Sequence, residues 1–373
     1  MTENMAVEFE AKSQGCLLGA AVGDALGAGC EMMTADSISK YYGKVLSYIP
    51  EAEQRFPEDC KRTPGCYTDD TEMALGLAVS LTRTRGLVDT KDIAEQHVRL
   101  YSSWRGYGRG TTKVLEALSA GADLEGIGIE LTRPSYEPKA TWLGSNSNGG
   151  SMRIHPLGVL AAVAGSSEDT LRLATRLALQ PTHTHPEAVD AAFIQASAVQ
   201  QLCRESSCTV RIPELLSQLQ SKAETKAMQT KLQILSEGLA AGKSEIDIVD
   251  NVENGLLGMD GVRAVEAVSC ALCCLAFHTD KPSEGLIAAV GYGGDCDTIP
   301  GMAGALFGAL HGLPSSWMPP EWTSGFEPEV MNSLNSPDRE NHGVTKGASL
   351  LLGAGSFKVS TLQLKKQPRP RKP

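Results

Sequence analysis

The sequence has few aromatic residues, no long apolar run and no excess of positive charge. Phe, Trp and Tyr make up 5% of its 373 residues, and the formal net charge at neutral pH is −10. No apolar stretch reaches the roughly 18 residues that a membrane-spanning helix needs. An acidic chain also lacks the positive field on which non-specific binding to nucleic acid depends. We therefore expect neither a membrane span nor direct contact with nucleic acid.

We also expect no disulfide bonds, although the ten cysteines form an even number that would allow pairing. Cys270, Cys273 and Cys274 lie in an apolar run, where a free thiol behaves as a small hydrophobic group. Residues 1–12 contain three glutamates and no apolar core, so they do not resemble a secretory signal. These features predict reduced thiols and a cytoplasmic protein, with the nucleus as a second compartment.

Glycine and small apolar residues are abundant, with 38 glycines and 42% apolar residues in the chain. Gly15, Gly19, Gly23 and Gly27 recur every four residues within a helical pattern, so they fall near one helix face. There they would allow close approach of another backbone, at a cost of about 1 kcal/mol each relative to alanine. The run 262–277 is apolar all round, which predicts a buried helix.

Helical periodicity extends over most of the chain, and no alternating strands, internal repeat or clear linker are visible. We therefore predict an all-α fold, a single compact multi-helix domain over residues 13–355. Residues 1–12 form an N-terminal arm in this prediction, and the basic residues 356–373 form a disordered tail. The expected helices are 13–27, 71–84, 89–101, 111–119, 156–163, 167–179, 185–204, 262–277 and 300–311, with one or two surface helices in 212–242.

The first chemically suggestive motif is Thr68-Asp69-Asp70-Thr71 with Glu72, just before an apolar helix. Helix capping is the simpler interpretation, with Asp69 as the N-cap and Glu72 three residues on. Capping does not explain two adjacent aspartates flanked by threonines, because neighbouring carboxylates repel unless a cation or a proton intervenes. Metal binding is therefore the alternative interpretation.

The second motif is a glycine-led acidic loop, Gly293-Gly294-Asp295-Cys296-Asp297-Thr298. In an extended loop, the i, i+2 spacing places Asp295 and Asp297 on one side. Asp297 or Thr298 could simply cap the following helix, but this leaves Asp295 without a role. Cys296, between the two aspartates, should point away from a hard cation.

Together, the two motifs offer oxygen ligands at two helix starts, without a nearby cluster of histidine or cysteine. Such donors select Mg²⁺, Mn²⁺ or Ca²⁺ over Zn²⁺. Four aspartates and two threonines fit a pair of bridged metal ions better than one, with Asp297 as the bridge. A metal pair can position a substrate oxygen or activate water.

Two further carboxylates lie near the glycine-rich helix. Asp24 ends an almost wholly apolar helix, where a buried carboxylate is costly unless it is paired or bound to a metal. Glu31 follows a glycine turn and is free to project into a cleft. The simpler alternatives are a buried Asp24 that is satisfied by hydrogen bonds and a Glu31 that only carries charge at a helix end.

Two glycine-rich loops, residues 106–110 and 144–150, could cradle an anion on backbone N–H groups at a helix start. Most glycine loops are simple turns, so each signal is weak alone. His183 and His185 stand two residues apart, but no acidic or thiol partner is near to complete a zinc site. A capping or ligand-contacting histidine is the better interpretation.

In this order, the motifs resemble those of the ADP-ribosylglycohydrolases, which include the dinitrogenase reductase-activating glycohydrolase and the ADP-ribosylarginine and ADP-ribosylserine hydrolases. The ordered set spans about residues 15–312, and the combination is more specific than any single motif. It consists of Gly19, Gly23-Asp24, Gly27, Glu31, Thr68-Asp69-Asp70-Thr71, Asn148-Gly149, Met152-Arg153, Thr182-His183 and the loop 293–298.

The resemblance implies an all-α fold with two Mg²⁺ ions in a central binuclear cleft, with Mn²⁺ as an alternative. Glu31 resembles the acidic residue beside the metals in the ADP-ribosylserine branch, and we take Glu31 and Asp70 as candidate catalytic residues. One ion would be held by Thr68, Asp69, Asp70 and Asp297, and the other by Asp295, Asp297 and Thr298. The glycine loops would hold the diphosphate and adenosine through Gly108, Gly110, Gly144, Ser145, Asn146, Asn148 and His183.

The implied activity is Mg-dependent hydrolysis of an N- or O-glycosidic bond to ADP-ribose, on a modified protein or a small molecule. Cleavage at ribose C1 passes through an oxocarbenium-like state. A carboxylate such as Glu31 can pass a proton to the leaving group or activate water. The expected partner is then an ADP-ribosylated protein or conjugate, and a monomer is the default oligomeric state.

The chain departs from the family pattern in three respects. Cys296 replaces the usual middle threonine, but the ligand positions remain, so we expect activity to survive. The ADP-ribosylserine branch has an aromatic residue where this chain has Asn146, which weakens adenine stacking. Pro300 and Gly301 replace small helix formers and should only shift the helix start.

Two rival functions remain open at this point. A catalytically reduced ADP-ribose-binding or crystallin-like structural relative would tolerate the loss of ligands, yet Glu31 and all four cluster aspartates are present. Another two-metal hydrolase, such as a phosphoesterase, is compatible with the metal spacing. It is disfavoured only by the glycine loops and the family pattern.

Overall fold

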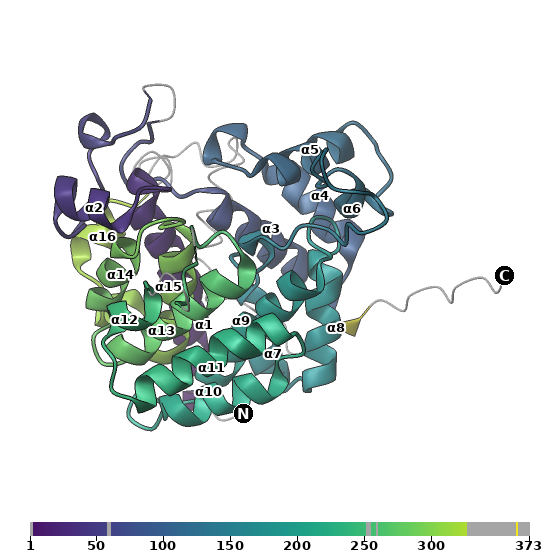
Figure 1. Ribbon diagram of the computed structural model, residues 1–373. Helices are drawn as coiled ribbons and strands as arrows, with labels where there is room; N and C mark the ends of the chain where they lie inside the picture. Colours follow the sequence, from purple (N-terminus) through teal and green to yellow (C-terminus); the bar gives the residue numbers. More distant parts are fainter. Residues whose placement is uncertain (1–2, 58–60, 251–254, 259, 327–362, 365–373) are drawn as a thin grey trace, which may run out of the picture.

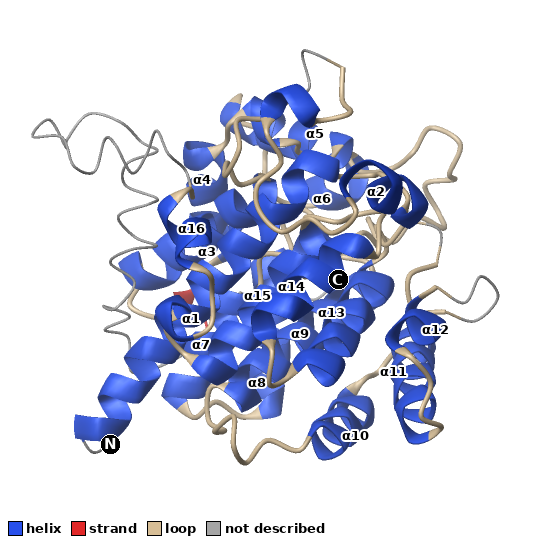
Figure 2. Cartoon of the chain, turned by 90° about the vertical axis from the view of Figure 1, so that its left-hand side faces the viewer, coloured by secondary structure: helices blue, strands red, loops and turns tan. Residues whose placement is uncertain are grey.

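The computed structural model describes residues 3–57, 61–250, 255–258, 260–326 and 363–364, whose regular secondary structure is almost entirely helical (Figure 1, Figure 2). The predicted all-α class is confirmed. The helices are α1 (Glu3–Gly27), α2 (Ala35–Tyr42), α3 (Asp69–Arg83), α4 (Thr90–Leu100), α5 (Arg109–Ser119), α6 (Ile127–Glu130), α7 (His155–Ala164), α8 (Glu168–Leu179), α9 (Pro186–Leu202), α10 (Ile212–Lys222), α11 (Lys226–Ala240), α12 (Glu245–Val249), α13 (Ala264–His278), α14 (Pro282–Gly291), α15 (Thr298–His311) and α16 (Pro320–Ser324).

Within the described residues, strand structure is limited to one parallel pair. β1 (Leu87–Val88) lies beside β2 (Gln363–Leu364), with Leu87 opposite Gln363. The rest of the predicted tail, residues 356–362 and 365–373, lies outside the described residues. No helix in the described part of the chain combines the length and the apolar character needed to cross a membrane.

Most of the predicted helices are present, and their ends lie within a few residues of the expected ones. The first helix is the main difference, because α1 begins at Glu3 rather than at residue 13. The polar stretch 212–242 forms two helices, α10 and α11. Helices α2, α6, α12, α14 and α16 were not predicted, and each has ten residues or fewer. So few turns leave little periodicity to detect in a sequence.

Helices α1 and α15 pack backbone to backbone through glycines. A Cβ atom at Gly19 would lie 2.2 Å from the carbonyl oxygen of Gly304, and one at Gly304 would lie 2.0 Å from that of Gly19. At Gly27, the last residue of α1, a Cβ would lie 1.5 Å from the carbonyl oxygen of Cys296. The predicted close approach is confirmed, and it holds the end of α1 against the acidic loop before α15.

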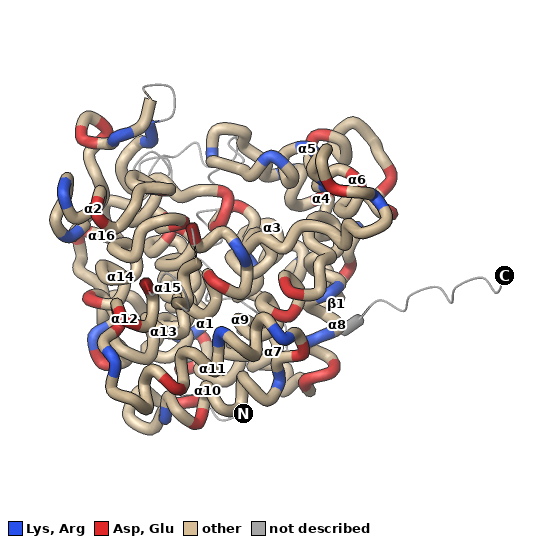
Figure 3. The backbone as a smooth tube through the Cα atoms, viewed as in Figure 1, with Lys and Arg blue, Asp and Glu red and all other residues tan. Residues whose placement is uncertain are grey.

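The core forms around α1, α9, α13 and α15, with α7 packed on α1 and α9. Residues 264–275 of α13 are all buried, as its apolar sequence predicted. Helix α3 contacts α1, α7 and α15. Its first turn lies near the first turn of α15, since the charge of Asp297 acts on both Asp69 and Asp70. In the view of Figure 3, Lys and Arg alternate with Asp and Glu around the periphery.

Candidate active site

The acidic motifs meet where α1 ends and where α3 and α15 begin. Thr68 is the N-cap of α3, and its Oγ1 accepts a hydrogen bond from the backbone N–H of Asp70 at 3.4 Å. Asp297 is the N-cap of α15 and accepts from the backbone N–H of Thr298 at 2.9 Å. The capping interpretation is therefore correct for Asp297 and wrong for Asp69, whose expected place Thr68 takes. Both helix starts favour negative charge through their exposed N–H groups.

Asp24 ties α1 to the start of α3. Its fully buried carboxylate accepts hydrogen bonds from the backbone N–H of Thr68 at 3.0 Å and of Thr71 at 3.1 Å. The Thr71 hydroxyl donates a third bond at 2.5 Å. Burial, and then the charge of Asp297, raises the pKa of Asp24 to about 7. The interpretation of Asp24 as a buried, hydrogen-bonded carboxylate is confirmed.

The remaining aspartates form a cluster of mutually repelling carboxylates around Asp297. Burial is the main cause that raises the pKa of Asp69, Asp70 and Asp295 well above the ordinary range, and the charge of Asp297 is the second. Asp70 Oδ1 is buried without a hydrogen-bond partner. An orphaned carboxylate oxygen among other carboxylates is a donor that a cation or a proton would satisfy.

Glu31 and Arg62 lie beside this cluster. Burial, and then Asp297, raises the pKa of Glu31 to about 7, although 25% of its side chain is exposed. Arg62 Nη2 donates to Glu31 Oε2 at 2.6 Å, and Arg62 Nη1 lies 3.8 Å from Asp297 Oδ2. Burial by itself lowers the pKa of Arg62. The charges of Glu31 and Asp297 outweigh this effect and raise the pKa above its ordinary value. Sequence reasoning missed Arg62, because it stands in an irregular loop without a motif.

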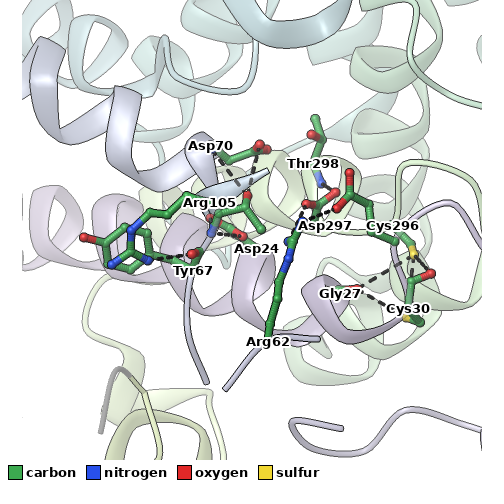
Figure 4. A network of polar contacts seen from close by, with 12 residues as sticks. Asp24, Gly27, Cys30, Arg62, Tyr67, Asp70, Arg105, Cys296, Asp297 and Thr298 are labelled. Atoms are coloured by element: carbon green, nitrogen blue, oxygen red, sulfur yellow. Dashed lines mark hydrogen bonds and ion pairs between the residues drawn. The ribbon is translucent and has the colours of Figure 1, made fainter. Parts of the chain in front are cut away.

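These residues fit a divalent cation by their chemistry. The donors are oxygen atoms, which suit Mg²⁺ or Mn²⁺ rather than Zn²⁺, and Asp70 has a free oxygen. However, no three His, Cys, Asp or Glu side chains in the described part of the chain are arranged to hold a metal ion as they stand. Arg62 approaches Asp297 instead (Figure 4). The binuclear centre and its cleft therefore stay predictions.

Cys296 points away from the carboxylates, as expected, and contacts Cys30 (Figure 4). The two Sγ atoms are 3.6 Å apart, and the Cys296 thiol donates to the carbonyl oxygen of Cys30 at 3.0 Å. Both side chains are fully buried. Burial raises the pKa of the Cys296 thiol well above its usual value.

Asn148 joins the glycine loop 144–150 to the second acidic motif. Its Nδ2 donates to Asp295 Oδ2 at 2.6 Å and to the carbonyl oxygen of Gly261 at 3.2 Å. Its backbone N–H donates to the carbonyl oxygen of Val262 at 2.8 Å. Asn148 was predicted as a substrate contact, and the structure makes it a partner of a predicted metal ligand.

His183 lies against the same loop. Its Nε2 is 2.9 Å from Ser147 Oγ, which in turn is 2.9 Å from Ser145 Oγ. Burial, and then the charge of Arg153, lowers the pKa of His183 to about 3, so the imidazole is neutral near pH 7. His185 accepts a hydrogen bond from the N-terminus of α9, which confirms the capping interpretation for that histidine.

Two other loop residues are held through the backbone. Gly144 has a φ of 108°, and a Cβ there would lie 2.2 Å from Thr184 Oγ1, so only glycine fits. The carbonyl oxygen of Asn146 accepts from the backbone N–H of Ala264 at 3.0 Å. The loop is therefore fixed between the segment before α9 and the start of α13.

The other glycine loop, residues 106–110, approaches the cluster through its first residue. A Cβ at Gly106 would lie 2.5 Å from Arg62 Nη2. The Tyr107 hydroxyl donates to Glu72 Oε2 at 2.6 Å, so Glu72 holds this loop and does not complete a capping box.

The two residues of that loop that were predicted to contact substrate are Gly108 and Gly110. Gly108 is the N-cap of α5, and the position of a Cβ there has no atom within 4 Å. At Gly110, a Cβ would meet Thr132 at 3.3 Å. The start of α5 is thus open at Gly108, whereas Gly110 packs on a neighbouring loop.

Comparison with known proteins decides the family. A sequence model of the ADP-ribosylglycohydrolases matches residues 5–345. The chain belongs to the ADP-ribosylglycohydrolase family. It is 29% identical to mouse ADP-ribosylhydrolase ARH3, over 84% of this chain and 88% of that protein. It is 28% identical to the ADP-ribosyl-[dinitrogen reductase] glycohydrolase of Rhodospirillum rubrum, over 82% and 89%.

A solved ADP-ribosylglycohydrolase-related protein complex has the same fold, with a TM-score of 0.64 at 24% identity. The similarity covers 95% of this chain and 99% of that one. Family membership makes the protein a hydrolase of glycosidic bonds to ADP-ribose. Family membership removes the basis of the phosphoesterase alternative. The non-enzymatic alternative loses its basis because the acidic residues of the family pattern are present and lie together.

Proposed function

We propose that this ADP-ribosylglycohydrolase removes ADP-ribose from modified proteins and that two Mg²⁺ ions are required, with Mn²⁺ as a substitute. The observation that supports this most is the meeting of buried carboxylates at three helix ends. Their burial and mutual repulsion raise their pKa values, and a divalent cation would relieve both costs. The carboxyl groups with raised pKa values are those of Asp69, Asp70, Asp295 and Glu31, and Asp297 is the charge that lies among them.

The proposed ligands divide between two ions that share Asp297. Bound metal would polarise and fix the ribose hydroxyls next to the scissile bond. Asn148 would keep the Asp295 carboxylate oriented through its 2.6 Å hydrogen bond. The first set is Thr68, Asp69, Asp70 and Asp297, and the second is Asp295, Asp297 and Thr298.

Glu31 is the proposed acid–base residue. Its pKa of about 7 lets it hold a proton for the leaving group and, once ionised, accept one from attacking water. The ribose passes through an oxocarbenium-like state, which nearby carboxylates stabilise. Asp70 is the second candidate, because its unpartnered Oδ1 is available to a ligand or a water molecule.

The two glycine loops are the proposed holder of the diphosphate and adenosine. Gly108 leaves the N-terminus of α5 open, where backbone N–H groups favour phosphate. The hydroxyl pair Ser145–Ser147, which neutral His183 orients through its hydrogen bond with Ser147, offers polar contacts from the other glycine loop. Asn146 provides no aromatic face, so we expect weak adenine stacking. The proposed contact residues are Gly108, Gly110, Gly144, Ser145, Asn146, Asn148 and His183.

A protein conjugate is the proposed substrate class. The mouse relative is named as an ADP-ribosylhydrolase, and the Rhodospirillum rubrum relative is named for ADP-ribosylated dinitrogen reductase. We further propose a monomer that works in the cytoplasm, with the nucleus as a second location.

The direct test is release of ADP-ribose from a panel of substrates, with Mg²⁺ and with chelator. The panel holds ADP-ribosylserine and ADP-ribosylarginine peptides, poly(ADP-ribose) and O-acetyl-ADP-ribose. We expect Mg-dependent release from at least one peptide. Release that is equal in chelator would contradict the metal requirement, and release from no peptide would contradict the substrate class.

Asp297→Ala tests the shared ligand in the same assay. We expect Mg-dependent release to be abolished, because both proposed metal positions lose a carboxylate. Asp169→Ala is the matched control, since Asp169 is an exposed aspartate in the first turn of α8. Wild-type release by the Asp297 variant would refute the assignment.

A further inference from the structure

We propose that Cys30 and Cys296 form a peroxide-sensitive thiol pair, whose disulfide switches off the proposed active site. The two sulfur atoms already touch, at 3.6 Å, although the residues are 266 positions apart in the chain. A disulfide needs a separation of about 2.05 Å, so the sulfur atoms have to approach by roughly 1.5 Å.

Backbone hydrogen bonds already connect the two loops beside the cysteine pair. The N–H of Met32 donates to the carbonyl oxygen of Gly294 at 2.7 Å, and the N–H of Gly294 donates to that of Met33 at 2.8 Å. Two residues further along, the Cys296 thiol donates to the carbonyl oxygen of Cys30 at 3.0 Å. The two loops therefore lie side by side in a fixed register, and bond formation needs no large rearrangement.

Oxidation of the pair would affect the proposed active site, because both cysteines are next to its residues in the chain. Cys30 directly precedes Glu31, the proposed acid–base residue. Cys296 stands between Asp295 and Asp297, which we propose as metal ligands. Drawing the two sulfur atoms together would shift both loops of the site, and a displacement of about 1 Å in a catalytic group can cost on the order of 100-fold in rate. This consequence rests on the proposed function, whereas formation of the disulfide does not.

Access of peroxide to the pair would come through the residues that directly follow Cys30. Both thiols are buried, but Glu31 is a quarter exposed and Met32 is 54% exposed. Solvent thus lies one residue from Cys30, and hydrogen peroxide is barely larger than water. Small fluctuations of this loop would admit the oxidant.

One molecule of hydrogen peroxide is enough to oxidise the two thiols to a disulfide. The Cys30 thiol loses its proton and its sulfur attacks a peroxide oxygen. The O–O bond breaks, the leaving hydroxide takes up that proton, and a sulfenic acid on Cys30 and one water molecule result. The Cys296 sulfur then attacks the sulfenic sulfur, the S–O bond breaks, and the oxygen leaves as a second water molecule. Each of the two water molecules has taken up one thiol proton. Two electrons pass from the sulfur pair to the peroxide, and thiol reductants reverse the change.

The test is peptide mapping of the full-length protein after peroxide treatment. Cys208→Ser serves as the background, because Cys208 is exposed and could link two molecules. Cleavage after glutamate places Cys296 in residues 285–321, with no other cysteine. Cys30 falls in residues 11–31 together with Cys16, and fragmentation distinguishes the two. We expect a Cys30–Cys296 cross-link that dithiothreitol removes.

Activity provides the second measurement. We expect peroxide to lower ADP-ribose release by about 10- to 100-fold in the Cys208→Ser background, with recovery in dithiothreitol. Cys296→Thr, which restores the residue usual in the family, should resist peroxide. Cys30→Ser should also resist, and its hydroxyl can keep the 3.3 Å bond that the thiol donates to the carbonyl oxygen of Gly27.

The outcomes separate this proposal from the proposed function. Absence of the cross-link, or a link of Cys30 or Cys296 to a different cysteine such as Cys60, overturns the thiol pair. A cross-link with undiminished release overturns the switch. If the reduced protein releases no ADP-ribose, the proposed function fails, while the peptide map still decides whether the disulfide forms.

Discussion

Arg62 Nη2 donates a hydrogen bond of 2.6 Å to Glu31 Oε2, and this contact places a cation beside the proposed acid–base carboxylate. The backbone of Arg62 is held by Gln54, whose Oε1 accepts from the Arg62 N–H at 2.8 Å and whose Nε2 donates to its carbonyl oxygen at 2.6 Å. The guanidinium also lies 3.8 Å from Asp297. Arg62 therefore neutralises charge in the place where a metal ion is proposed to do so.

Arg62→Ala should increase the affinity for Mg²⁺, because a competing positive charge near Asp297 is removed. Two unit charges 4 Å apart interact by about 1 kcal/mol even at the dielectric of water, so we expect at least a fivefold lower dissociation constant. Calorimetric titration with Mg²⁺ measures this value. Arg99→Ala, which removes an exposed arginine from α4, should leave it unchanged. Weaker Mg²⁺ binding by the Arg62 variant would show that the guanidinium supports the metal site.

Glu31→Gln should bind ADP-ribose almost normally and turn over substrate slowly. The amide keeps the size of the side chain but cannot exchange a proton, so a loss of about 10²- to 10⁴-fold in kcat is expected. Single-turnover kinetics and equilibrium binding of ADP-ribose separate the two effects. A fully active variant would mean that the acid–base role belongs to another residue.

Without divalent cations, the acidic cluster should stabilise the fold less as pH rises. Asp24 and Glu31 have pKa values of about 7, and the pKa values of Asp69, Asp70 and Asp295 are also raised, so these carboxyl groups hold more protons in the folded than in the unfolded chain between about pH 4 and 7. Their contribution to the free energy of unfolding therefore decreases with pH across this window, whereas buried histidines with lowered pKa values contribute with the opposite sign. Thermal unfolding at a series of pH values, with chelator and with Mg²⁺, measures the effect, which Mg²⁺ should reduce.

Asp70→Asn should flatten this dependence and raise the unfolding temperature in chelator, because it removes one of the repelling charges. Glu116→Gln, at an exposed position of α5, is the control and should leave the profile unaltered. An Asp70→Asn profile with the same slope as the wild-type profile in chelator would contradict the upward shift in the pKa of Asp70.

Gly19→Ala should destabilise the fold, because the new methyl group would meet the Gly304 carbonyl oxygen at 2.2 Å. Overpacking of this kind costs about 1–3 kcal/mol. Urea unfolding measures the change. Gly291→Ala is the matched helical control, since a Cβ there meets nothing within 4 Å, and it should be neutral or slightly stabilising. Equal stability of the two variants would show that α1 and α15 can separate without cost.

The local features of this protein follow closely from its sequence. Glycine at every fourth position predicted the packing face of α1, and the apolar run 262–277 predicted the burial of α13, because both patterns need only helical geometry. The acidic motifs before α3 and α15 could likewise be recognised from residue types and their spacing. Short helices such as α2 and α12 could not, since tertiary contacts stabilise them more than their own periodicity does.

The tertiary structure decided which distant side chains meet. Arg62 with Glu31, Asn148 with Asp295 and Cys30 with Cys296 are separated by 31, 147 and 266 residues. No periodicity links such positions, because their contact depends on how α1, α3 and α15 pack and where the intervening loops return. The sequence by itself thus determined the helical fold and the oxygen-rich chemistry. The glycine-mediated approach of α1 to α15 determined that two acidic motifs, a glutamate, an arginine and a thiol pair share one site.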